Sequence, residues 1–271
     1  MNFVDLLSAR LNVSYGNGTV VLRDLRLNIL PGEIVGLVGH SGSGKSSLAA
    51  ALLGLIQCKG GSSSGSVLWS GRELLALKEK EWQNVRGKQI AFVPQSPLSS
   101  LNPALSLRTQ FEEAWKLHRK SSRDERQAAI FRALEDVALP ASNDFLKRYP
   151  SQISVGQAQR CLIAMAILHS PRLLIADEPT SALDAITQAE ILSLFGQLNR
   201  ERGMAILFVS HDLLSVYSLC HRVALLHEGS IVECGTPQQV FFRPRHPFTQ
   251  KLVAALPQLP EAQKAEHAFS L

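Results

Sequence analysis

The chain carries the octapeptide Gly39-His40-Ser41-Gly42-Ser43-Gly44-Lys45-Ser46 directly after the apolar run Ile34–Val38 and directly before the helix-favouring stretch Lys45–Leu55. The octapeptide fits GxxxxGK[ST], and its place between a strand and a helix predicts a phosphate-binding loop. Glycines let backbone N–H groups turn inward around phosphate oxygens, and the helix adds its positive end. In such a loop Lys45 reaches the β- and γ-phosphates and Ser46 ligates Mg²⁺; we count Ser47 among the nucleotide-binding residues as well. A dinucleotide-binding GxGxxG loop is excluded, because no third glycine follows Gly44 at the required spacing.

Two adjacent carboxylates end a second apolar run. The stretch Leu173–Ala176 predicts a buried strand, which places Asp177 and Glu178 at the carboxyl edge of the sheet, where ligands bind in such folds. There Asp177 can hold Mg²⁺, directly or through water, and Glu178 can orient and polarise the attacking water. Taken alone, an Asp-Glu pair after a strand is more often an acidic helix N-terminus. In a chain with a phosphate-binding loop, we prefer the catalytic interpretation.

The composition is that of a soluble globular protein. With 271 residues, of which 45% are hydrophobic and 19% charged, one or two domains with a sizeable core are expected and disorder throughout is excluded. No apolar run approaches the ~18 residues of a membrane-spanning helix. Because the start, Met1–Asp5, also lacks the pattern of a signal peptide, we expect a cytosolic chain. The net charge of +5 is compatible with nucleic acid, an anionic membrane surface or a nucleotide, although we prefer ordinary solubilising charge as its explanation.

The cysteines show neither a metal-binding nor a disulfide pattern. They are Cys58, Cys161, Cys220 and Cys234, and no two of them form a CxxC pair. Three of the four lie among apolar residues. This favours buried, reduced thiols over disulfides or a metal site.

Short apolar segments alternate with helix-favouring stretches along most of the chain, which predicts a mainly parallel sheet with crossover helices. The expected strands are Leu11–Val13, Val20–Leu30, Ile34–Val38, Ile90–Val93, Leu173–Ala176, Ile206–Val209 and Val223–Leu226. Between Leu105 and Tyr149 the sequence is charged and helix-favouring, so an inserted helical subdomain is expected. Its expected helices are Phe111–Lys120 and Asp124–Val137. The run Gly60–Gly65 is expected to be a flexible, exposed connection, and the tail after Leu256 to be loosely held.

Together with Ser154-Val155-Gly156-Gln157, the two motifs resemble those of ATP-binding cassette (ABC) ATPases, and the resemblance covers nearly the whole chain. The stretch Ile153–Gln157 is similar to the family signature Leu-Ser-Gly-Gly-Gln. The resemblance implies an α/β fold: a RecA-like P-loop NTPase core with a mainly parallel sheet, an antiparallel β subdomain and an inserted helical subdomain. It also implies a single domain over residues 1–271. Within it, 1–94 and 166–235 would form the core with the N-terminal β subdomain, 95–165 the helical subdomain with the signature, and 236–271 a C-terminal extension.

The resemblance assigns further site residues, each of which also has a simpler explanation. Tyr15 is similar to the aromatic residue that stacks on adenine, but it could be an ordinary aromatic in a turn. Gln95 is similar to the glutamine of the loop that joins the core to the helical subdomain and ligates Mg²⁺, but it could supply simple loop polarity. Asp184 resembles the loop that communicates across the dimer, or it caps a helix. His211 is similar to the switch histidine, or it is a satisfied core histidine or a cap. The catalytic residues that we predict are Lys45, Gln95, Glu178 and His211.

The mechanism implied by the resemblance needs two chains. One chain holds ATP in its phosphate loop, and the signature of a second chain closes over the γ-phosphate, so the site is complete only in a head-to-tail pair. Ser154 is placed to cap the helix Ala158–Leu168, whose N-terminus, with Gly156 and Gln157, would face the partner's ATP. Val155 stands where the pattern has glycine. We hypothesise that Val155 weakens this signature and makes the two ATP sites of a heterodimer unequal, although it could be a tolerated substitution.

Three stretches are similar to the peptide and nickel importers of the family: Val93–Pro103, Tyr149–Gln152 and His246–Leu252. This resemblance implies as partners a second ABC ATPase subunit, two transmembrane permeases and an extracytoplasmic solute-binding protein. The chain would then lie at the cytoplasmic face of the inner membrane, held there by the permeases. Their coupling helices would enter a groove beside Gln95 and the loop Ser96–Asn102. Peptides, nickel and metal chelates all stay open as cargo, as does the identity of the partner ATPase.

Two other functions fit parts of the sequence. An ABC ATPase that acts on DNA or ribosomes is permitted by the charge of +5. Such proteins usually carry two cassettes, a long coiled coil or zinc-binding insertions, and we expect no nucleic-acid partner here. A P-loop kinase would leave the signature-like stretch and His211 without a role. A transport ATPase with ATP and Mg²⁺ as cofactors uses all of these features.

Overall fold

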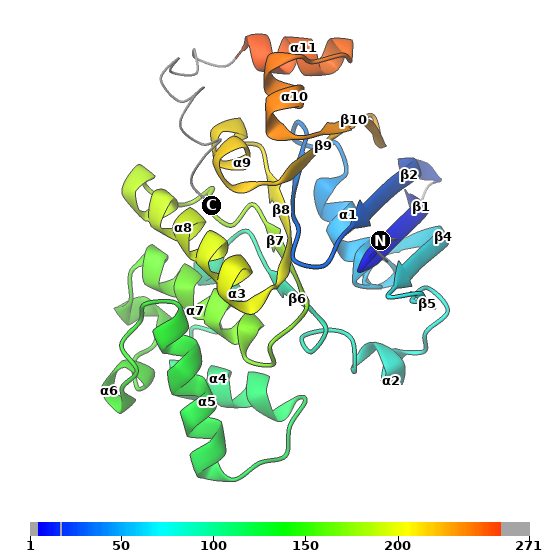
Figure 1. Cartoon of the computed structure of the whole chain (residues 1–271). Coiled ribbons are helices and arrows are strands. Elements are labelled where there is room, and N and C mark those ends of the chain that lie inside the picture. Colours follow the sequence, from blue (N-terminus) through cyan, green and yellow to red (C-terminus); the bar gives the residue numbers. More distant parts are fainter. Residues whose placement is uncertain (1–4, 17, 256–271) are drawn as a thin grey trace.

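Figure 1 shows the computed structural model, in which residues 5–16 and 18–255 are described, as two β-sheets flanked by helices. The central sheet contains β3 (Ile34–Val38), β6 (Ile90–Val93), β7 (Leu173–Asp177), β8 (Ala205–Ser210), β9 (Arg222–His227) and β10 (Ser230–Gly235). These six strands lie in the order β10-β9-β3-β8-β7-β6. All neighbours pair in parallel except β10, which joins the edge antiparallel to β9. The mainly parallel sheet and the α/β class expected from the sequence are therefore confirmed.

The inner strands of this sheet are covered on both faces. Every residue of β3, β7 and β8 is buried. Ile34 and Val38 of β3 belong to the apolar core beneath the helices of the insertion, whereas Val35 and Leu37 belong to a second core beneath the N-terminal strands. Because each face has its own apolar layer, these strands read as continuous apolar runs instead of alternating patterns.

A second, antiparallel sheet contains β1 (Leu7–Tyr15), β2 (Thr19–Ile29), β4 (Gly61–Trp69) and β5 (Arg72–Glu73), in the order β2-β1-β4-β5. The expectation of a flexible connection over Gly60–Gly65 is wrong, because Gly61–Gly65 pairs with β1. The absence of a side chain permits this close pairing, since a Cβ on Gly65 would lie 2.1 Å from the carbonyl oxygen of Arg10. The first half of β4 is largely solvent-exposed, so it lacks the apolar residues by which a strand is recognised in a sequence.

Helices fill the chain between β6 and β7, and no strand occurs there among the described residues. They are α3 (Pro97–Ser100), α4 (Leu107–Lys116), α5 (Arg123–Asp136), α6 (Asn143–Leu146), the 3₁₀ turn η2 (Pro150–Gln152) and α7 (Val155–Ile167). Four of them begin after a serine whose hydroxyl accepts a hydrogen bond from a first-turn N–H: Ser106, Ser122, Ser142 and Ser154. The helical insertion is confirmed, although α4 lies one turn earlier than the expected Phe111–Lys120. The boundary expected at residue 165 falls inside α7, and the division into subdomains stays a prediction.

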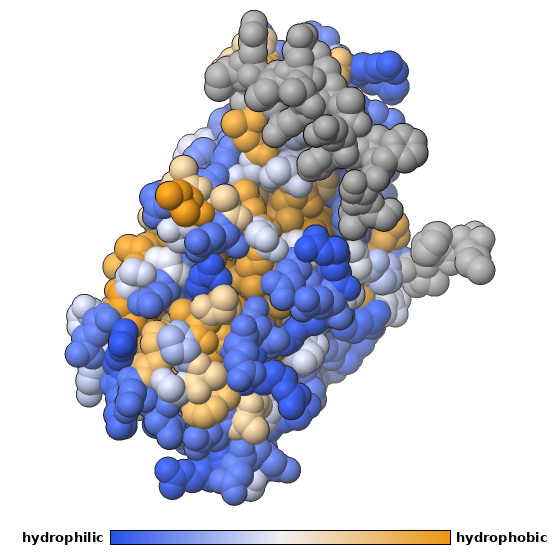
Figure 2. All heavy atoms as spheres, turned by 60° about the vertical axis from the view of Figure 1, so that its left-hand side comes forward, coloured by the Kyte–Doolittle hydropathy of each residue, from blue (hydrophilic) through white to orange (hydrophobic). Residues whose placement is uncertain are grey.

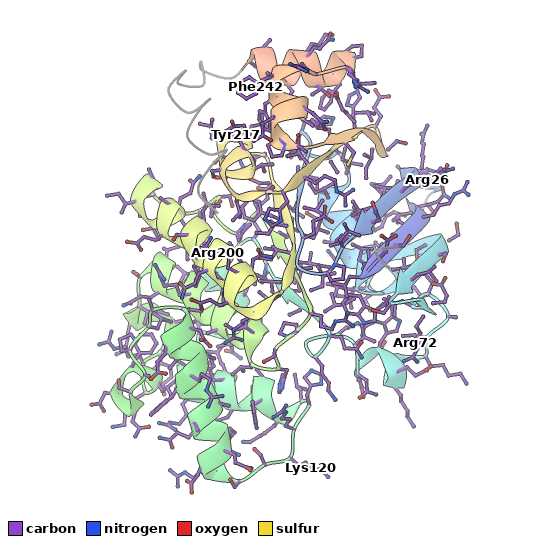
Figure 3. All side chains as sticks on the ribbon, in the orientation of Figure 1. Arg26, Arg72, Lys120, Arg200, Tyr217 and Phe242 are labelled. Carbon is purple, nitrogen blue, oxygen red and sulfur yellow. The ribbon has the colours of Figure 1, made fainter. Side chains whose placement is uncertain are left out.

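The remaining helices lie between strands or, as α10 and α11 do, follow β10. They are α1 (Lys45–Leu52), the 3₁₀ turn η1 (Gln57–Lys59), α2 (Glu79–Trp82), α8 (Ala185–Arg202), α9 (Leu213–Leu219), α10 (Pro237–Phe242) and α11 (Pro247–Ala254). Helix α1 is shorter than the expected Lys45–Leu55, because the chain turns at Gly54, whose φ is 64°. Tyr217 and Phe242, labelled in Figure 3, hold α10 against α9 with ring centroids 5.9 Å apart. Figure 1 shows α10 and α11 beyond the edge formed by β9 and β10, and the expected loose tail after Leu256 lies outside the described residues.

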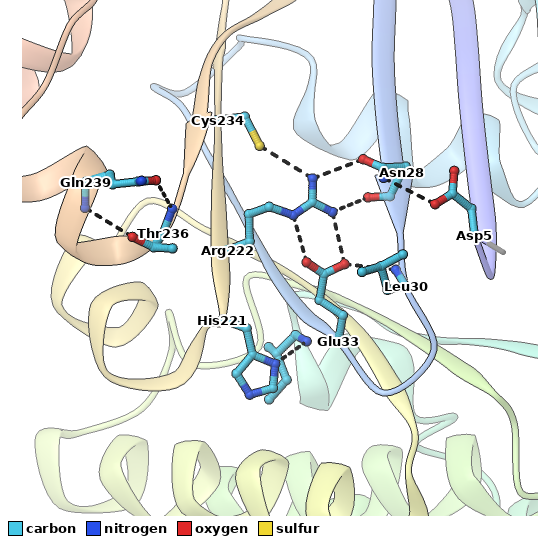
Figure 4. A network of polar contacts seen from close by, with 10 residues as sticks. Asp5, Asn28, Leu30, Glu33, His221, Arg222, Cys234, Thr236 and Gln239 are labelled. Carbon is cyan, nitrogen blue, oxygen red and sulfur yellow. Dashed lines mark hydrogen bonds and ion pairs between the residues drawn. The ribbon is translucent and has the colours of Figure 1, made fainter. Parts of the chain in front are cut away.

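An ion pair ties the two sheets together, as Figure 4 shows. Arg222, at the start of β9, donates from Nε to Glu33 Oε1 at 2.7 Å and from Nη2 to the carbonyl oxygen of Asn28 on β2 at 2.6 Å. The Arg222 and Glu33 side chains are 23% and 11% exposed. The hydrogen bond that Arg222 donates to Glu33 outweighs the cost of burial and raises the pKa of Arg222. Arg222 therefore stays charged, and its hydrogen bonds to Asn28 on β2 fasten the N-terminal sheet to the central one.

The cysteine prediction holds only in part. Cys161 and Cys220 are buried free thiols, but Cys58 and Cys234 are exposed. Cys58 lies in the η1 turn and Cys234 on the edge strand β10, where one side faces solvent. Burial raises the pKa of Cys161 to about 12, so this thiol is unreactive at neutral pH.

Basic side chains project from several separate elements of the surface. The four labelled in Figure 3 are exposed and come from β2, β5, the turn after α4 and α8: Arg26, Arg72, Lys120 and Arg200.

Over residues 5–16 and 18–255, none of the helices combines the length and the apolar composition that crossing a membrane requires.

Candidate nucleotide-binding site

The predicted phosphate-binding loop joins β3 to α1. Strand β3 ends at Val38 and α1 begins at Lys45, so the octapeptide spans the turn between them. Gly44 has a φ of 106°, and a Cβ there would lie 2.6 Å from Leu22 Cδ2, so both its backbone and its surroundings require glycine. Gly39 passes equally close to β9, because its Cβ would lie 2.4 Å from the carbonyl oxygen of Leu226. The loop is therefore packed against two strands.

Lys45 lies inside this loop and not on its surface. The residue is 6% exposed, and its Nζ donates to the carbonyl oxygens of Gly39 at 2.7 Å and His40 at 3.1 Å. The same Nζ is 3.7 Å from Glu178 Oε1. A positive charge is thus held between the loop backbone and the end of β7.

Asp177 ends β7 beside the first turn of α1. The residue is 7% exposed, and its Oδ1 has no hydrogen-bond partner. Burial raises the pKa of this carboxyl, although a hydrogen bond with Ser46 acts in the opposite direction. A buried carboxylate oxygen without a partner next to a hydroxyl group fits a hard cation such as Mg²⁺, which favours oxygen ligands and keeps several sites for phosphate and water. Within the described residues, no group of three or more His, Cys, Asp or Glu is arranged for a metal, so such an ion would depend on the nucleotide for further ligands.

Three side chains converge on the carboxylate of Glu178, which is 16% exposed. Gln95 Nε2 donates to Oε2 at 3.2 Å, and His211 Nδ1 donates to the same oxygen at 3.0 Å. Lys45 approaches Oε1 from the other side. The backbone of Glu178 has a φ of 47°, and its N–H donates to the carbonyl oxygen of Val209 at 2.8 Å. This unusual conformation is therefore anchored to β8 and aims the carboxylate at the loop.

The order of the strands explains this convergence. Gln95 follows β6, Glu178 follows β7 and His211 follows β8, and these three parallel strands are neighbours in the sheet. Their carboxyl ends lie at one edge, where the intervening loops meet. The structure thus brings together Lys45, Gln95, Glu178 and His211, which the sequence predicted as the catalytic group.

A cleft of about 600 Å³ opens at this edge. Its lining residues are Val21, Ser41, Gly42, Gly44, Lys45, Ser46, Ser47, Gln95, Glu178 and His211. Val21 was not anticipated, because in the sequence it is one apolar residue of a predicted strand. Gly39, His40, Ser43 and Asp177 do not line the cleft, although they belong to the loop or lie beside it.

Tyr15 lies at the end of β1 against the first turn of α1. Its hydroxyl is 3.1 Å from Ser47 Oγ, and its half-buried ring passes so close to Gly61 that a Cβ there would be 2.9 Å from Tyr15 Cδ1. The residue does not line the cleft in this structure. Stacking of Tyr15 on adenine stays a prediction.

The signature residues cap their own helix. Ser154 Oγ accepts from the N–H of Gln157 at 3.2 Å, and Gln157 Oε1 accepts from the N–H of Ser154 at 3.1 Å. The predicted cap is confirmed, although α7 begins at Val155, three residues before the expected start. Asp184 caps α8 in the same way, accepting from the N–H of Thr187 at 3.0 Å, as its simpler explanation foresaw. None of Ser154, Gly156, Gln157 and Asp184 lines the cleft of their own chain, so their roles toward a second chain stay predictions.

Comparison with known proteins identifies the family to which this chain belongs. The sequence profile of the ABC transporter family matches residues 22–181. The oligopeptide transport ATP-binding protein OppD of Escherichia coli is 40% identical over 260 residues, which are 96% of this chain and 76% of that protein. The dipeptide transport ATP-binding protein DppD of Escherichia coli is 38% identical over 265 residues, or 97% of this chain and 80% of that protein.

Solved structures agree. CbiO1 of Clostridium perfringens, part of the ABC transporter complex cbiONQ, superposes with a TM-score of 0.77 at 28% identity, covering 93% of this chain and 96% of that one. A dimeric post-hydrolysis state of the ATP-binding cassette MJ0796, bound to ADP and Pi, gives 0.73 at 29% identity, covering 85% and 98%. Relatives and solved structures thus match over most of the chain, and the family profile spans the phosphate loop, so the protein belongs to the ABC transporter family as an ATP-binding cassette.

Proposed function

We propose that the chain is the ATP-hydrolysing subunit of a bacterial ABC importer that takes up peptides, nickel or metal-chelator complexes. The convergence of Lys45, Gln95 and His211 on Glu178 at the rim of the phosphate loop carries the proposal. The names of its relatives favour peptide-like cargo: they include oligopeptide, dipeptide, peptidoglycan and glutathione transport or import ATP-binding proteins. The chain spans 48% and 42% of the peptidoglycan and glutathione proteins.

The geometry suits hydrolysis of a nucleoside triphosphate. ATP would enter the cleft with its phosphates on the loop, where Lys45 exchanges its contacts with loop carbonyls for the β- and γ-phosphate oxygens. Mg²⁺, held by Ser46, Gln95 and Asp177, would supply neutralisation of phosphate charge. Glu178 then accepts a hydrogen bond from the attacking water and polarises it. Gln95 and His211 hold the Glu178 carboxylate in place, because both donate to one of its oxygens and leave the other turned toward Lys45.

A second ABC subunit would complete the site. The capped N-terminus of α7 offers backbone N–H groups and a positive helix end to the γ-phosphate held by that partner, and Ser154, Gly156 and Gln157 lie at that end. Asp184 would lie at the same interface. We expect a head-to-tail heterodimer, with Val155 making the two ATP sites unequal.

A groove on the helical insertion suits the permeases. A cleft of about 660 Å³ is lined by Ser100, Asn102, Leu105, Gln110, Glu113, Ala114, Lys116, Leu117 and Met165. Leu117 is 77% exposed at its rim, and Figure 2 shows apolar patches that interrupt the hydrophilic surface on the helical side of the molecule. A coupling helix of each permease would bury such residues, since exposed apolar groups drive association. This contact would hold the chain at the cytoplasmic face of the inner membrane, below an extracytoplasmic solute-binding protein.

The substitution Glu178→Gln tests the proposed chemistry. It keeps the hydrogen bonds possible at this position but removes the base, so ATP turnover should fall about 100-fold or more while ATP binding persists. With ATP, the variant should accumulate as a closed dimer in size-exclusion chromatography. Glu201→Gln, on an exposed part of α8, is the matched control and should hydrolyse ATP normally. Normal turnover by Glu178→Gln would exclude Glu178 as the base.

The substitution Leu117→Glu tests the permease groove. It should weaken co-purification with the permeases without altering the ATPase activity of the isolated subunit, because Leu117 follows α4 of the helical insertion and does not line the cleft that contains Glu178. Leu68→Glu, at a partly exposed apolar position on β4, should leave the complex intact. Equal loss of the complex in both variants would argue against this groove.

A further inference from the structure

The side chain of His40 belongs to the phosphate loop but packs away from the cleft. Its ring lies edge-on to His227 at the end of β9, with centroids 5.7 Å apart, and edge-on to Phe248 of α11 at 6.1 Å. His227 and Phe248 stack on one another, with centroids 4.0 Å apart and an angle of 12° between the rings. We refer to these three residues as the ring stack. It connects the nucleotide-binding loop with a helix more than two hundred residues later in the chain.

Hydrogen bonds and burial hold helix α11 in place and thereby define the position of Phe248. Its first N–H group is capped, because the N–H of Phe248 donates to His246 Nδ1 at 3.2 Å. The Glu233 carboxylate on β10 accepts from the N–H groups of Arg245 at 2.9 Å and His246 at 3.0 Å. Thr249, in the first turn of α11, is fully buried. In Figure 1, α11 lies just beyond the edge where β9 and β10 end.

The ring of His40 is also hydrogen-bonded to the loop backbone. Its Nδ1 donates to the carbonyl oxygen of Ser41 at 2.7 Å, and its own carbonyl oxygen accepts from Lys45 Nζ at 3.1 Å. The orientation of the imidazole therefore bears on the peptide groups between residues 40 and 42. These peptide groups lie in the part of the loop whose N–H groups must face phosphate. A displaced ring would release the Ser41 carbonyl and leave this half of the loop free to adopt other conformations.

We propose that Phe248 and His227 are positioning residues for the phosphate loop, through which the C-terminal extension sets the affinity of the cassette for ATP. They act on the nucleotide through His40 and do not touch it. Removing the stack lowers the fraction of chains whose loop is ready to bind, and apparent affinity falls by that fraction. Bound ATP restores the loop geometry, so the rate of hydrolysis at saturation is unaffected. This inference rests on the proposed ATPase function.

The test compares ATP affinity and turnover in full-length variants. Phe248→Ala should raise the KM for ATP and the Kd of ATP about two- to tenfold, the range expected from loss of an aromatic pair, with kcat within about twofold of wild type. Phe248→Tyr keeps the stacked ring and should restore both constants. Leu252→Ala is the matched control: like Phe248, Leu252 is partly buried on α11 and packs against the apolar core, but it takes no part in the ring stack. It should lower thermal stability without altering the KM.

A double-mutant cycle separates the ring stack from general destabilisation. His227→Ala should raise the KM to a similar extent, and the double variant should be little worse than either single one, because both remove the same support. If Phe248→Ala does not fold, Phe248→Leu, which keeps apolar volume but loses the ring, carries the same expectation. An unchanged KM in a folded Phe248 variant, or an equal rise in Leu252→Ala, would overturn the proposal. Failure of the wild type to bind ATP would instead refute the proposed function.

Discussion

Replacement of Asp177 by asparagine should stabilise the nucleotide-free protein and at the same time impair ATP hydrolysis. The residue is 7% exposed at the end of β7, its Oδ1 has no hydrogen-bond partner, and burial is the main cause of its raised pKa. Glu178 adds a second negative charge that acts in the same direction. Without Mg²⁺, a charge at this position is therefore unfavourable. Asparagine keeps the shape and the hydrogen bond to Ser46 but carries no charge.

The size of the effect follows from what the substitution removes and what it leaves. Leaving a buried polar group unsatisfied costs about 1–3 kcal/mol. Asparagine still leaves one atom without a partner, and the attraction between Asp177 and Lys45 is lost, so only part of this cost is recovered. We expect a gain of about 1 kcal/mol, which raises Tm by about 2–4 °C in a protein of this size.

The stabilisation by Asp177→Asn should increase as the pH rises. The folded state raises the pKa of Asp177 above its unfolded value, so the folded protein favours the protonated form. Below the unfolded pKa of about 3.9, Asp177 is protonated in both states and does not destabilise the fold. As the pH rises through the folded pKa, the buried carboxyl becomes charged and the folded protein loses stability. The difference in Tm between Asp177→Asn and wild type should therefore be largest at neutral pH. It should close as the pH falls toward about 4.

Thermal melts from pH 4 to pH 8, with and without Mg·ATP, measure the change in stability, and a steady-state ATPase assay measures the loss of hydrolysis. Mg·ATP should stabilise the wild type more than Asp177→Asn, because only the wild type offers the metal a carboxylate. The control is Asp144→Asn, at an exposed carboxylate 2.9 Å from Lys147, which should show no such gain. A lower Tm of the nucleotide-free Asp177→Asn variant at neutral pH would refute the reasoning.

Three further substitutions probe the signature and the link between the sheets. Val155→Gly should increase ATP turnover of the reconstituted complex if this signature is weakened, and identical turnover would remove that hypothesis. Gly156→Ala should lower Tm and ATP turnover, because the new Cβ would lie 2.7 Å from Thr187 Cγ2 and overpacking costs about 1–3 kcal/mol. An unchanged melting curve would show that the Thr187 side chain can move aside. Arg222→Met should lower the free energy of unfolding by about 3 kcal/mol in urea titrations, since it leaves the carboxylate of Glu33 without its ion pair. A loss below about 1 kcal/mol would show that water replaces the guanidinium.

Much of the fold could be predicted because its central strands are buried on both faces. Ile34–Val38 has the bounds expected from its apolar run, since a doubly covered strand needs an apolar residue at nearly every position. Ile90–Val93 also has its expected bounds, although it is an edge strand with Phe92 exposed, because all four of its residues are apolar. Two strands with largely exposed or half-buried residues, β4 and β10, could not be recognised in this way. The first half of β4 is exposed and rich in glycine and serine, and β10 is only partly buried on the sheet edge. Exposed backbone pairing leaves little apolar pattern in a sequence.

The sequence by itself determined the phosphate loop, because GxxxxGK[ST] is a local requirement: the glycines, Lys45 and Ser46 must follow one another for the backbone to wrap around phosphate. It also determined the caps at Ser154 and Asp184, which depend on a hydrogen bond within three residues. Only the tertiary structure decided that Gln95 and His211 donate hydrogen bonds to the same oxygen of Glu178. It also decided that the ring of His40 contacts that of Phe248. These contacts join segments far apart in the chain, which the order of the strands and the position of α11 bring together. Neither is encoded in any short stretch of residues.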